Sequence, residues 1–269
     1  MQQQEAQPKG TTVGQSLPGL HARRTAATQA AFLVRHLRPG MRLVDCGCGP
    51  GTITIGLAGV VAPGEVVGVD LDAKRVAEAT RTAAEQGVAN VRFEEANVYE
   101  LPFPDEMFDA VYENAMLMHV DDAARAVREM WRVLKPGGVI GLRDVNLDGH
   151  LFTNANEGML ESHPLVRAWH VHRGIDMHLG ARVSTLLRDA GFLGIEGSAS
   201  YDSYGTREAV GQAAEQMARR IETVVADLAV EQGTADKAAI ARMAQAWRAW
   251  AEDPDAFWGG AHGEAVGWK

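Results

Sequence analysis

The segment 43–51, which reads LVDCGCGPG, constrains the fold of this chain more than any other feature. Residues 42–46 read as a buried strand, the glycines as a turn where a ligand meets bare backbone, and residues 52–57 as the start of a helix. A second apolar run, VGVD at 67–70, also ends in an aspartate. In a parallel α/β sheet the two strand ends lie side by side, so Asp45 and Asp70 are predicted to accept hydrogen bonds from ribose hydroxyls.

The glycine spacing departs from that of a dinucleotide-binding loop. Counted from Gly47 and Gly49, the third glycine of GxGxxG would stand at position 52, which holds Thr52. Pro50 removes a backbone N–H from the place where a pyrophosphate would bind. A cationic ligand without phosphate therefore fits the loop better, and an NAD-dependent oxidoreductase is the weaker alternative.

The segment resembles motif I of the class I S-adenosylmethionine-dependent methyltransferases, and the later motifs are similar to those of the ubiquinone/menaquinone-biosynthesis type. The resemblance covers residues 30–200 and rests on VRF at 91–93, AN at 96–97, LPF at 101–103, FDAV at 108–111 and RVLKPGG at 132–138. It implies S-adenosylmethionine as the cofactor. The residues implied to bind it are Asp45, Gly47, Cys48, Gly49, Gly51, Asp70, Leu71, Ala96, Asn97, Glu113 and Asn114.

Asn97 departs from the family pattern, which usually has an aspartate there that accepts a hydrogen bond from the adenine amino group. An asparagine carbonyl can accept the same bond.

Composition narrows the class of partner. The formal charge of −9 argues against a nucleic-acid substrate, because phosphate backbones are held by clustered Lys and Arg. The two cysteines, Cys46 and Cys48, are too close in the chain for a good disulfide, so a reducing cytoplasm is expected. We also expect a disordered tail over residues 1–20 without a signal peptide, and no membrane span.

The alternation of apolar runs and helical patterns predicts a doubly wound, mostly parallel α/β sheet with helices on both faces. We expect the S-adenosylmethionine-binding domain over residues 21–200, with a lid insertion at about 145–180. Residues 201–269 are predicted to be a helical cap of the same domain or a homodimer surface. The antiparallel seventh strand usual in this fold has no readable pattern.

The ranges of the expected elements follow the same patterns. Helices are expected at 26–37, 73–86 and 181–190, at 123–134 after an Asp121 or Asp122 cap, and as two helices between 206 and 252 that break near Gly233; the remaining strands are expected at 66–69, 91–93, 110–112, 139–142 and 192–198. An aromatic tail with Trp258 and Trp268 follows the last helix.

His119 is the candidate general base, since an imidazole titrates near neutral pH. Its alternative role is structural, shaping the cofactor pocket. Asp144 at the end of the fifth strand is a comparable candidate, which could instead pair with an arginine or face solvent.

The segment 163–178 carries four histidines, at 163, 170, 172 and 178. Their spacing lacks a zincin pattern, so no metal ion is predicted. These histidines are expected either to be polar residues of the substrate pocket or to be ordinary, partly exposed side chains. Trp247 and Trp250, three apart on a helix, are expected in a core or interface. Trp169, Trp258 and Trp268 are candidates for an apolar pocket that would suit an aromatic or polyketide-like acceptor.

These observations favour methyl transfer to O or C of a small molecule, since the Asn/Asp-Pro-Pro-Tyr/Phe sequence typical of amino methylation is absent. Binding does not prove transfer, so a methyltransferase fold with a non-catalytic or repurposed cofactor is the alternative.

Overall fold

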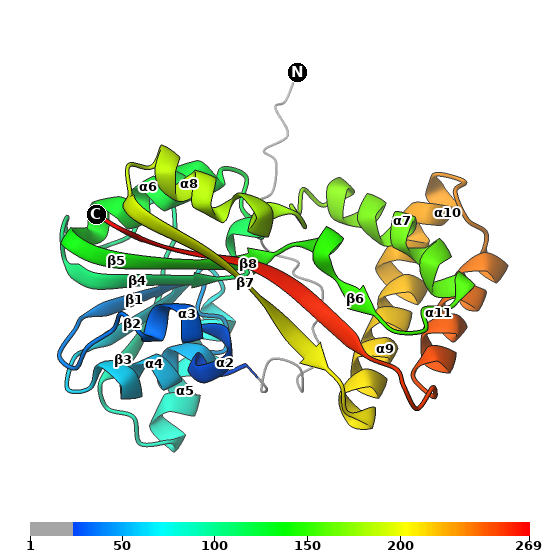
Figure 1. The fold of residues 1–269 in the computed structure, drawn as a ribbon, viewed down its shortest axis with the longest axis horizontal. Helices are drawn as coiled ribbons and strands as arrows, with labels where there is room; N and C mark the ends of the chain where they lie inside the picture. The colour runs from blue at the N-terminus through cyan, green and yellow to red at the C-terminus, as the bar shows by residue number, and fades with distance from the viewer. Residues whose placement is uncertain (1–23) are drawn as a thin grey trace.

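The computed structural model describes residues 24–269, which form one sheet flanked by helices and a separate helical group (Figure 1). The strands are β1 (Leu43–Cys46), β2 (Val66–Asp70), β3 (Val91–Glu95), β4 (Phe108–Asn114), β5 (Leu134–Val145), β6 (Leu151–Phe152), β7 (Leu193–Tyr204) and β8 (Trp258–Trp268). Their order is β3-β2-β1-β4-β5-β8-β6, with β7 also paired to β8. The first five strands are parallel and β8 is antiparallel to its neighbours, so the predicted doubly wound, mostly parallel sheet is confirmed.

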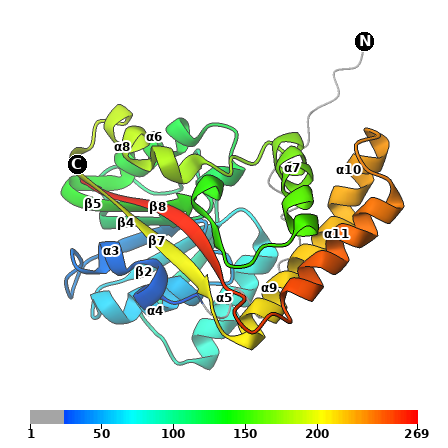
Figure 2. The same cartoon turned by 45° about the vertical axis from the view of Figure 1, so that its right-hand side comes forward.

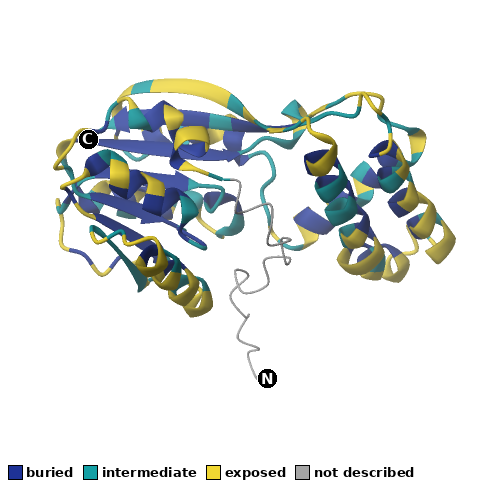
Figure 3. Cartoon of the chain, turned by 90° about the horizontal axis from the view of Figure 1, so that it is seen from below, coloured by how far each residue is buried: buried dark blue, intermediate teal, exposed yellow. Residues whose placement is uncertain are grey.

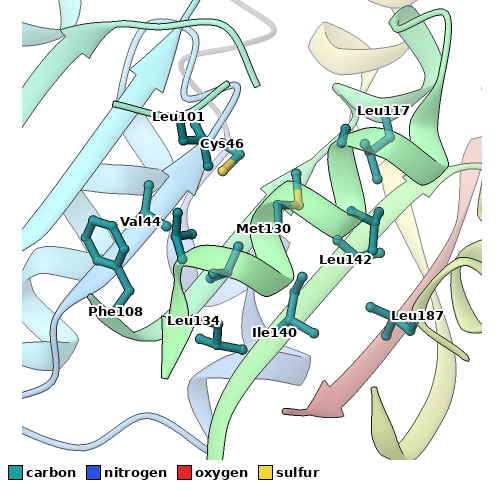
Figure 4. Packing of buried hydrophobic residues seen from close by; sticks show 14 of the residues in the cluster. Val44, Cys46, Leu101, Phe108, Leu117, Met130, Leu134, Ile140, Leu142 and Leu187 are labelled. Carbon is teal, nitrogen blue, oxygen red and sulfur yellow. The ribbon is translucent and has the colours of Figure 1, made fainter. Parts of the chain in front are cut away.

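Helices cover both faces of this sheet (Figure 1). One face carries α2 (Ala26–Gln29), α3 (Ala31–Val34), α4 (Thr52–Val61) and α5 (Ala73–Glu85), and the other carries α6 (Ala123–Val133) and α8 (Val183–Asp189). Asp122, rather than Asp121, caps α6 by accepting from the Arg125 amide. Figure 4 shows the apolar contact beneath α6, where Met130 packs with Leu134 and Ile140. This packing fixes the strand ends that carry the predicted ligand-binding residues.

A second group of helices stands beside the sheet (Figures 1 and 2). It consists of α7 (Glu157–His172), α9 (Arg207–Arg220), α10 (Ala226–Glu231) and α11 (Lys237–Trp250), with a π-helical turn (Ile221–Val225) between α9 and α10. Buried residues gather on the inward sides of these helices (Figure 3). Trp247 and Trp250 belong to this core, as predicted, and the Trp247 Nε1 donates to Ser162 Oγ at 2.9 Å.

The prediction of a helical cap with an aromatic tail was wrong for residues 258–268. They form β8, which lies between β5 and β7 as the reversed strand of the sheet. Its four glycines hide the strand pattern, because glycine is depleted in strands. At Gly263 the reason is steric: an added Cβ would lie 1.9 Å from the Gly180 carbonyl oxygen.

Three further elements differ from the sequence-based expectation. The single helix expected at 26–37 is broken at Ala30, where the Tyr112 hydroxyl donates to the Gln29 carbonyl at 3.0 Å. The helix expected at 181–190 begins as a 3₁₀ turn (Leu179–Arg182) before α8. The insertion at 145–180 contains β6 and the sixteen-residue α7 rather than irregular chain alone.

The expected tail at 1–20 lies outside the described residues. The boundary between 21–200 and 201–269 stays a prediction, although β8 belongs to the same sheet as β5. Within residues 24–269, no helix has the length and apolar character needed to cross a bilayer.

Candidate functional site

A cavity of about 790 Å³ lies at the carboxyl ends of the parallel strands and extends to the helical group. Its wall includes the predicted residues Asp45, Gly47, Cys48, Gly49, Asp70, Leu71, Ala96, Asn97, Asn114 and His119. Gly51 and Glu113 do not line it. The segments that the sequence placed around one crevice therefore meet in one cavity, and the ligand contact of each residue stays a prediction.

The glycine loop has a backbone that other residues would not tolerate. Gly47, Gly49 and Gly51 have φ values of +81°, +53° and +80°, in the left-handed region. A Cβ on Gly47 would lie 2.4 Å from Met116 Cγ. Gly49 has no such clash, but its amide donates to Asp70 Oδ2 at 2.9 Å. The loop thus presents bare backbone to the cavity.

Asp70 ties this loop to the end of β2. Besides Gly49, its carboxylate accepts from the Asp72 amide at 3.0 Å through Oδ1. Carboxylate oxygens have further lone pairs, so Asp70 retains acceptor capacity for ribose hydroxyls.

Asp45 is more buried than the other predicted ribose-binding residue, Asp70. Its side chain is buried and accepts from the Thr54 hydroxyl at 2.6 Å. Burial raises the pKa of Asp45 to about 7, with the Thr54 bond opposing and the Asp70 charge adding to the shift. A cation bound nearby would favour its ionised form.

Asn97 is held by its own loop, because its Oδ1 accepts from the Tyr99 amide at 2.9 Å. The second lone pair of that oxygen remains for an adenine amino group. The glycine loop, Asp70 and Asn97 therefore fit S-adenosylmethionine. The acidic side chains beside the loop would also attract the positively charged sulfonium.

The two predicted residues outside the cavity wall have structural contacts. Gly51 is the N-cap of α4, and a Cβ there would lie 2.8 Å from Ala79 Cβ and from Phe93 Cζ. Glu113 is fully buried, and its Oε1 accepts from the Met116 and Leu117 amides. Burial, followed by the Asp144 charge, raises the pKa of Glu113 well above its usual range.

Asn114 is positioned by Arg143, which the sequence analysis did not select. The buried Arg143 guanidinium donates to Asn114 Oδ1 at 3.0 Å and to Asp202 Oδ1 at 2.7 Å, and it lies 3.3 Å from Glu264 Oε1. Its partners come from β4, β7 and β8, so no local pattern could have revealed the network.

His119 lies in the cavity wall as a neutral imidazole. Burial lowers its pKa to about 4, and the positive charges of Arg75 and Arg220 contribute. Asp144 neither faces solvent nor pairs with an arginine: it is buried and accepts from the Met118 and Val145 amides. Burial raises the pKa of Asp144 to about 7.

The four histidines at 163–178 do not converge. His170 lines the cavity and donates from Nδ1 to the Val166 carbonyl at 2.7 Å, whereas His178 lies 3.1 Å from Asp148. In residues 24–269 no group of three or more His, Cys, Asp or Glu is placed to hold a metal ion. Two histidines that the sequence analysis did not single out, His150 and His262, also line the cavity.

Aromatic side chains form the far wall. Trp169, Trp258 and Tyr204 line the cavity, and the rings of Tyr204 and Trp258 stack with centroids 4.9 Å apart. Trp268 does not reach it and packs against His36.

Comparison with known proteins places this architecture in a family. A family model described as "Methyltransferase domain" matches residues 37–191. The chain belongs to this family. The sequence-based prediction of the family is confirmed, and with it S-adenosylmethionine as the cofactor that the family uses.

The curated relatives match only part of their length. An uncharacterized methyltransferase of Schizosaccharomyces pombe is 37% identical over 133 residues, 47% of this chain and 48% of that protein. The ubiquinone/menaquinone biosynthesis C-methyltransferase UbiE of Vibrio parahaemolyticus is 40% identical over 103 residues, 38% of this chain and 40% of that protein. The chain thus matches about half or less of these relatives' own length.

Several solved structures align over most of the chain. The crystal structure of the (4+2)-cyclase SpnF has a TM-score of 0.56 and 27% identity, covering 92% of this chain and 84% of that one. The fold therefore extends beyond the family match at 37–191.

Proposed function

We propose that this chain transfers the methyl group of S-adenosylmethionine to oxygen or carbon of a small aromatic or polyketide-like acceptor. The observation that best supports this proposal is a single cavity. Its wall combines the Gly47–Gly49 loop and Asp70 with the aromatic side chains Trp169, Tyr204 and Trp258. The first group suits a nucleoside and the second suits an apolar ring.

The cofactor supplies an electrophilic methyl group on a sulfonium. The Gly47–Gly49 loop and Asp70 would hold this cofactor, which would supply its methyl group to a lone pair or carbanion of the acceptor. The protein's part is to hold the acceptor in line and exclude water. Asp45 and Asp70 favour the cationic cofactor over its neutral product.

Neither His119 nor Tyr112 is suited to act as a strong general base. With a pKa of about 4, His119 is a weak base at neutral pH. The Tyr112 hydroxyl donates a hydrogen bond to the Gln29 carbonyl, and burial raises the pKa of that hydroxyl well above the usual range. We therefore propose that the acceptor reacts as an already ionised or carbon-activated species, with His119 in a structural role.

The test is calorimetric titration with S-adenosylmethionine and S-adenosylhomocysteine, followed by incubation of metabolite extracts with the trideuteromethyl cofactor. A metabolite that gains one deuterated methyl group, with equal release of S-adenosylhomocysteine, supports the proposal. Cofactor binding without any labelled product from extracts that contain the acceptor class would contradict it.

A repurposed use of the cofactor is the second candidate, because SpnF, the (4+2)-cyclase, aligns over 92% of this chain. That function predicts a product of unchanged mass that forms without consumption of the cofactor. Cytoplasmic location and a homodimer remain predictions, as does the absence of a nucleic-acid substrate.

A further inference from the structure

We propose that Arg220 is the anion-recognition residue of the acceptor site, so that the acceptor carries a carboxylate or another anionic oxygen group. The inference rests on the proposed function, since it names the class of substrate for the same cavity. Its evidence lies on the helical group, away from the glycine loop.

Arg220 is a partly buried cation without an ion pair among the described residues. It is the last residue of α9, and its side chain lines the cavity together with Gln216 one turn earlier. Within residues 24–269, no carboxylate lies within ion-pair distance of its guanidinium and no acceptor is hydrogen-bonded to it. Burial alone lowers the pKa of Arg220, and a guanidinium nevertheless stays charged at physiological pH.

A charge that is largely removed from water and has no ion-pair partner costs free energy, so a bound anion would stabilise it. The neighbouring arginines on the same helical group already have partners. Arg219 pairs with Glu215 at 2.7 Å, and Arg248 pairs with Glu215 and Glu222 at 2.7 and 2.6 Å. Arg220 is thus the exception among three closely placed arginines, and it is the one in the cavity wall.

Its surroundings favour an anion with an apolar body. The guanidinium carbon lies 5.7 Å from the centroid of the Trp169 ring, a cation–π contact that leaves the N–H donors free. The charge of Arg220 also contributes to the low pKa values of His119 and His170, for which burial is the larger cause. The side chains of Trp169, His119 and His170, which lie near Arg220, carry no negative charge that would repel an anion.

The charged residues of the cavity wall include Arg220 beside the Trp169 ring. At the nucleoside end, Asp45, Asp70, Asp72 and Glu95 line the wall together with Lys74 and Arg75, and Asp72 lies 3.8 Å from Arg75. Asp121 and Asp202 also line the wall, and Asp202 is already paired with Arg143 at 2.7 Å. An anionic acceptor would be attracted to Arg220, which gives orientation as well as affinity.

The test uses pairs of probes that differ only in charge: benzoate, naphthoate and anthracene carboxylate, each against its neutral carboxamide. Binding is measured by calorimetry on protein saturated with S-adenosylhomocysteine. We expect at least one carboxylate to bind wild-type protein about 10- to 100-fold more tightly than its amide, the range of a charge-assisted hydrogen-bonded pair. Arg220→Met should remove the preference, and Arg220→Lys should keep part of it.

Arg219→Met is the matched control, because it removes the same charge from an adjacent but exposed position. It should leave the carboxylate preference unchanged. Equal affinities of every carboxylate and amide in wild-type protein, or a preference that persists in Arg220→Met, would overturn the inference.

The cofactor titration separates the possible failures. If wild-type protein does not bind S-adenosylhomocysteine, the proposed function fails. If it binds and only the carboxylate preference is missing, the inference about Arg220 fails alone. If Arg220→Met keeps its melting temperature but loses S-adenosylhomocysteine affinity, Arg220 holds the amino-acid end of the cofactor and the inference is wrong.

Discussion

Replacing Arg143 with methionine should destabilise the protein strongly, because it leaves two buried carboxylates without their cation. Arg143 is fully buried, and Asp202 and Glu264 around it are 13% and 7% exposed at their side chains. Breaking a buried pair of this kind costs about 3–5 kcal/mol. For a chain of this size that corresponds to a fall in melting temperature of about 6–20 °C.

Arg42→Met is the control, since Arg42 pairs with Glu65 at 3.4 Å with both side chains about half exposed. Exposed pairs of this kind contribute about 1 kcal/mol or less. Thermal and urea unfolding followed by circular dichroism measure both variants. A loss in Arg143→Met no larger than that in Arg42→Met would refute the reasoning.

The pH dependence gives a second readout of the same network. Burial acts to raise the pKa of Asp202, but the charges of Arg143 and His262 outweigh it and hold that pKa below its usual range. The stabilisation is therefore present above the unfolded aspartate pKa of about 3.9 and is lost as pH falls through the lower folded value. The double variant Arg143→Met/Asp202→Asn tests the coupling of the two residues. Its loss in free energy of unfolding should be smaller than the sum of the losses in the two single variants.

Four other changes test the cofactor end of the cavity. Asp70→Ala should weaken S-adenosylmethionine binding by about 1–3 kcal/mol in calorimetry, because the ribose and loop acceptor is lost; an unchanged affinity would remove Asp70 from the site. Gly49→Val should abolish binding by forcing a β-branched residue to a φ of +53°, whereas Gly59→Ala, in α4 with open space around it, should bind normally; normal binding by the Gly49 variant would show that the loop is misassigned. His119→Ala should lower kcat less than tenfold, and a fall of about 100-fold with a rate inflection between about pH 6 and 8 would make it the base after all. Since the raised pKa of Asp45 is about 7, cofactor binding near that pH should release protons in paired-buffer calorimetry, and Asp45→Asn should abolish the release.

The sequence was informative where local chemistry decides the structure. The glycine loop, the capped helix after Asp122 and the five parallel strands each carry their own signal, because backbone angle, capping and apolar runs are set by neighbouring residues. Prediction failed at β8, whose glycines serve a contact with Gly180 some eighty residues away. Strand pairing of that kind is fixed by tertiary packing and leaves no local pattern.

The candidate site shows the same division. Nine of the eleven predicted cofactor-binding residues line the cavity, and they lie on motifs that can be read in order along the chain. Arg220 and His262 lie in the same wall but come from α9 and β8, elements with no motif of their own. Only the fold brings them opposite the glycine loop.

The residues at the nucleoside end of the cavity can therefore be predicted from sequence motifs, whereas those of the far wall cannot. The loop, Asp70 and Asn97 serve a ligand that is common to a whole family, so their residue types and spacing are restricted. Of the far wall, Arg220 on α9, Tyr204 on β7 and Trp258 on β8 form a group outside the family match at 37–191, whereas Trp169 on α7 lies inside it. If acceptor choice lies in that group, exchanging Arg220 should change which acceptor is bound while the affinity for the cofactor stays the same, and a coupled loss of both would show that one end cannot be altered without the other.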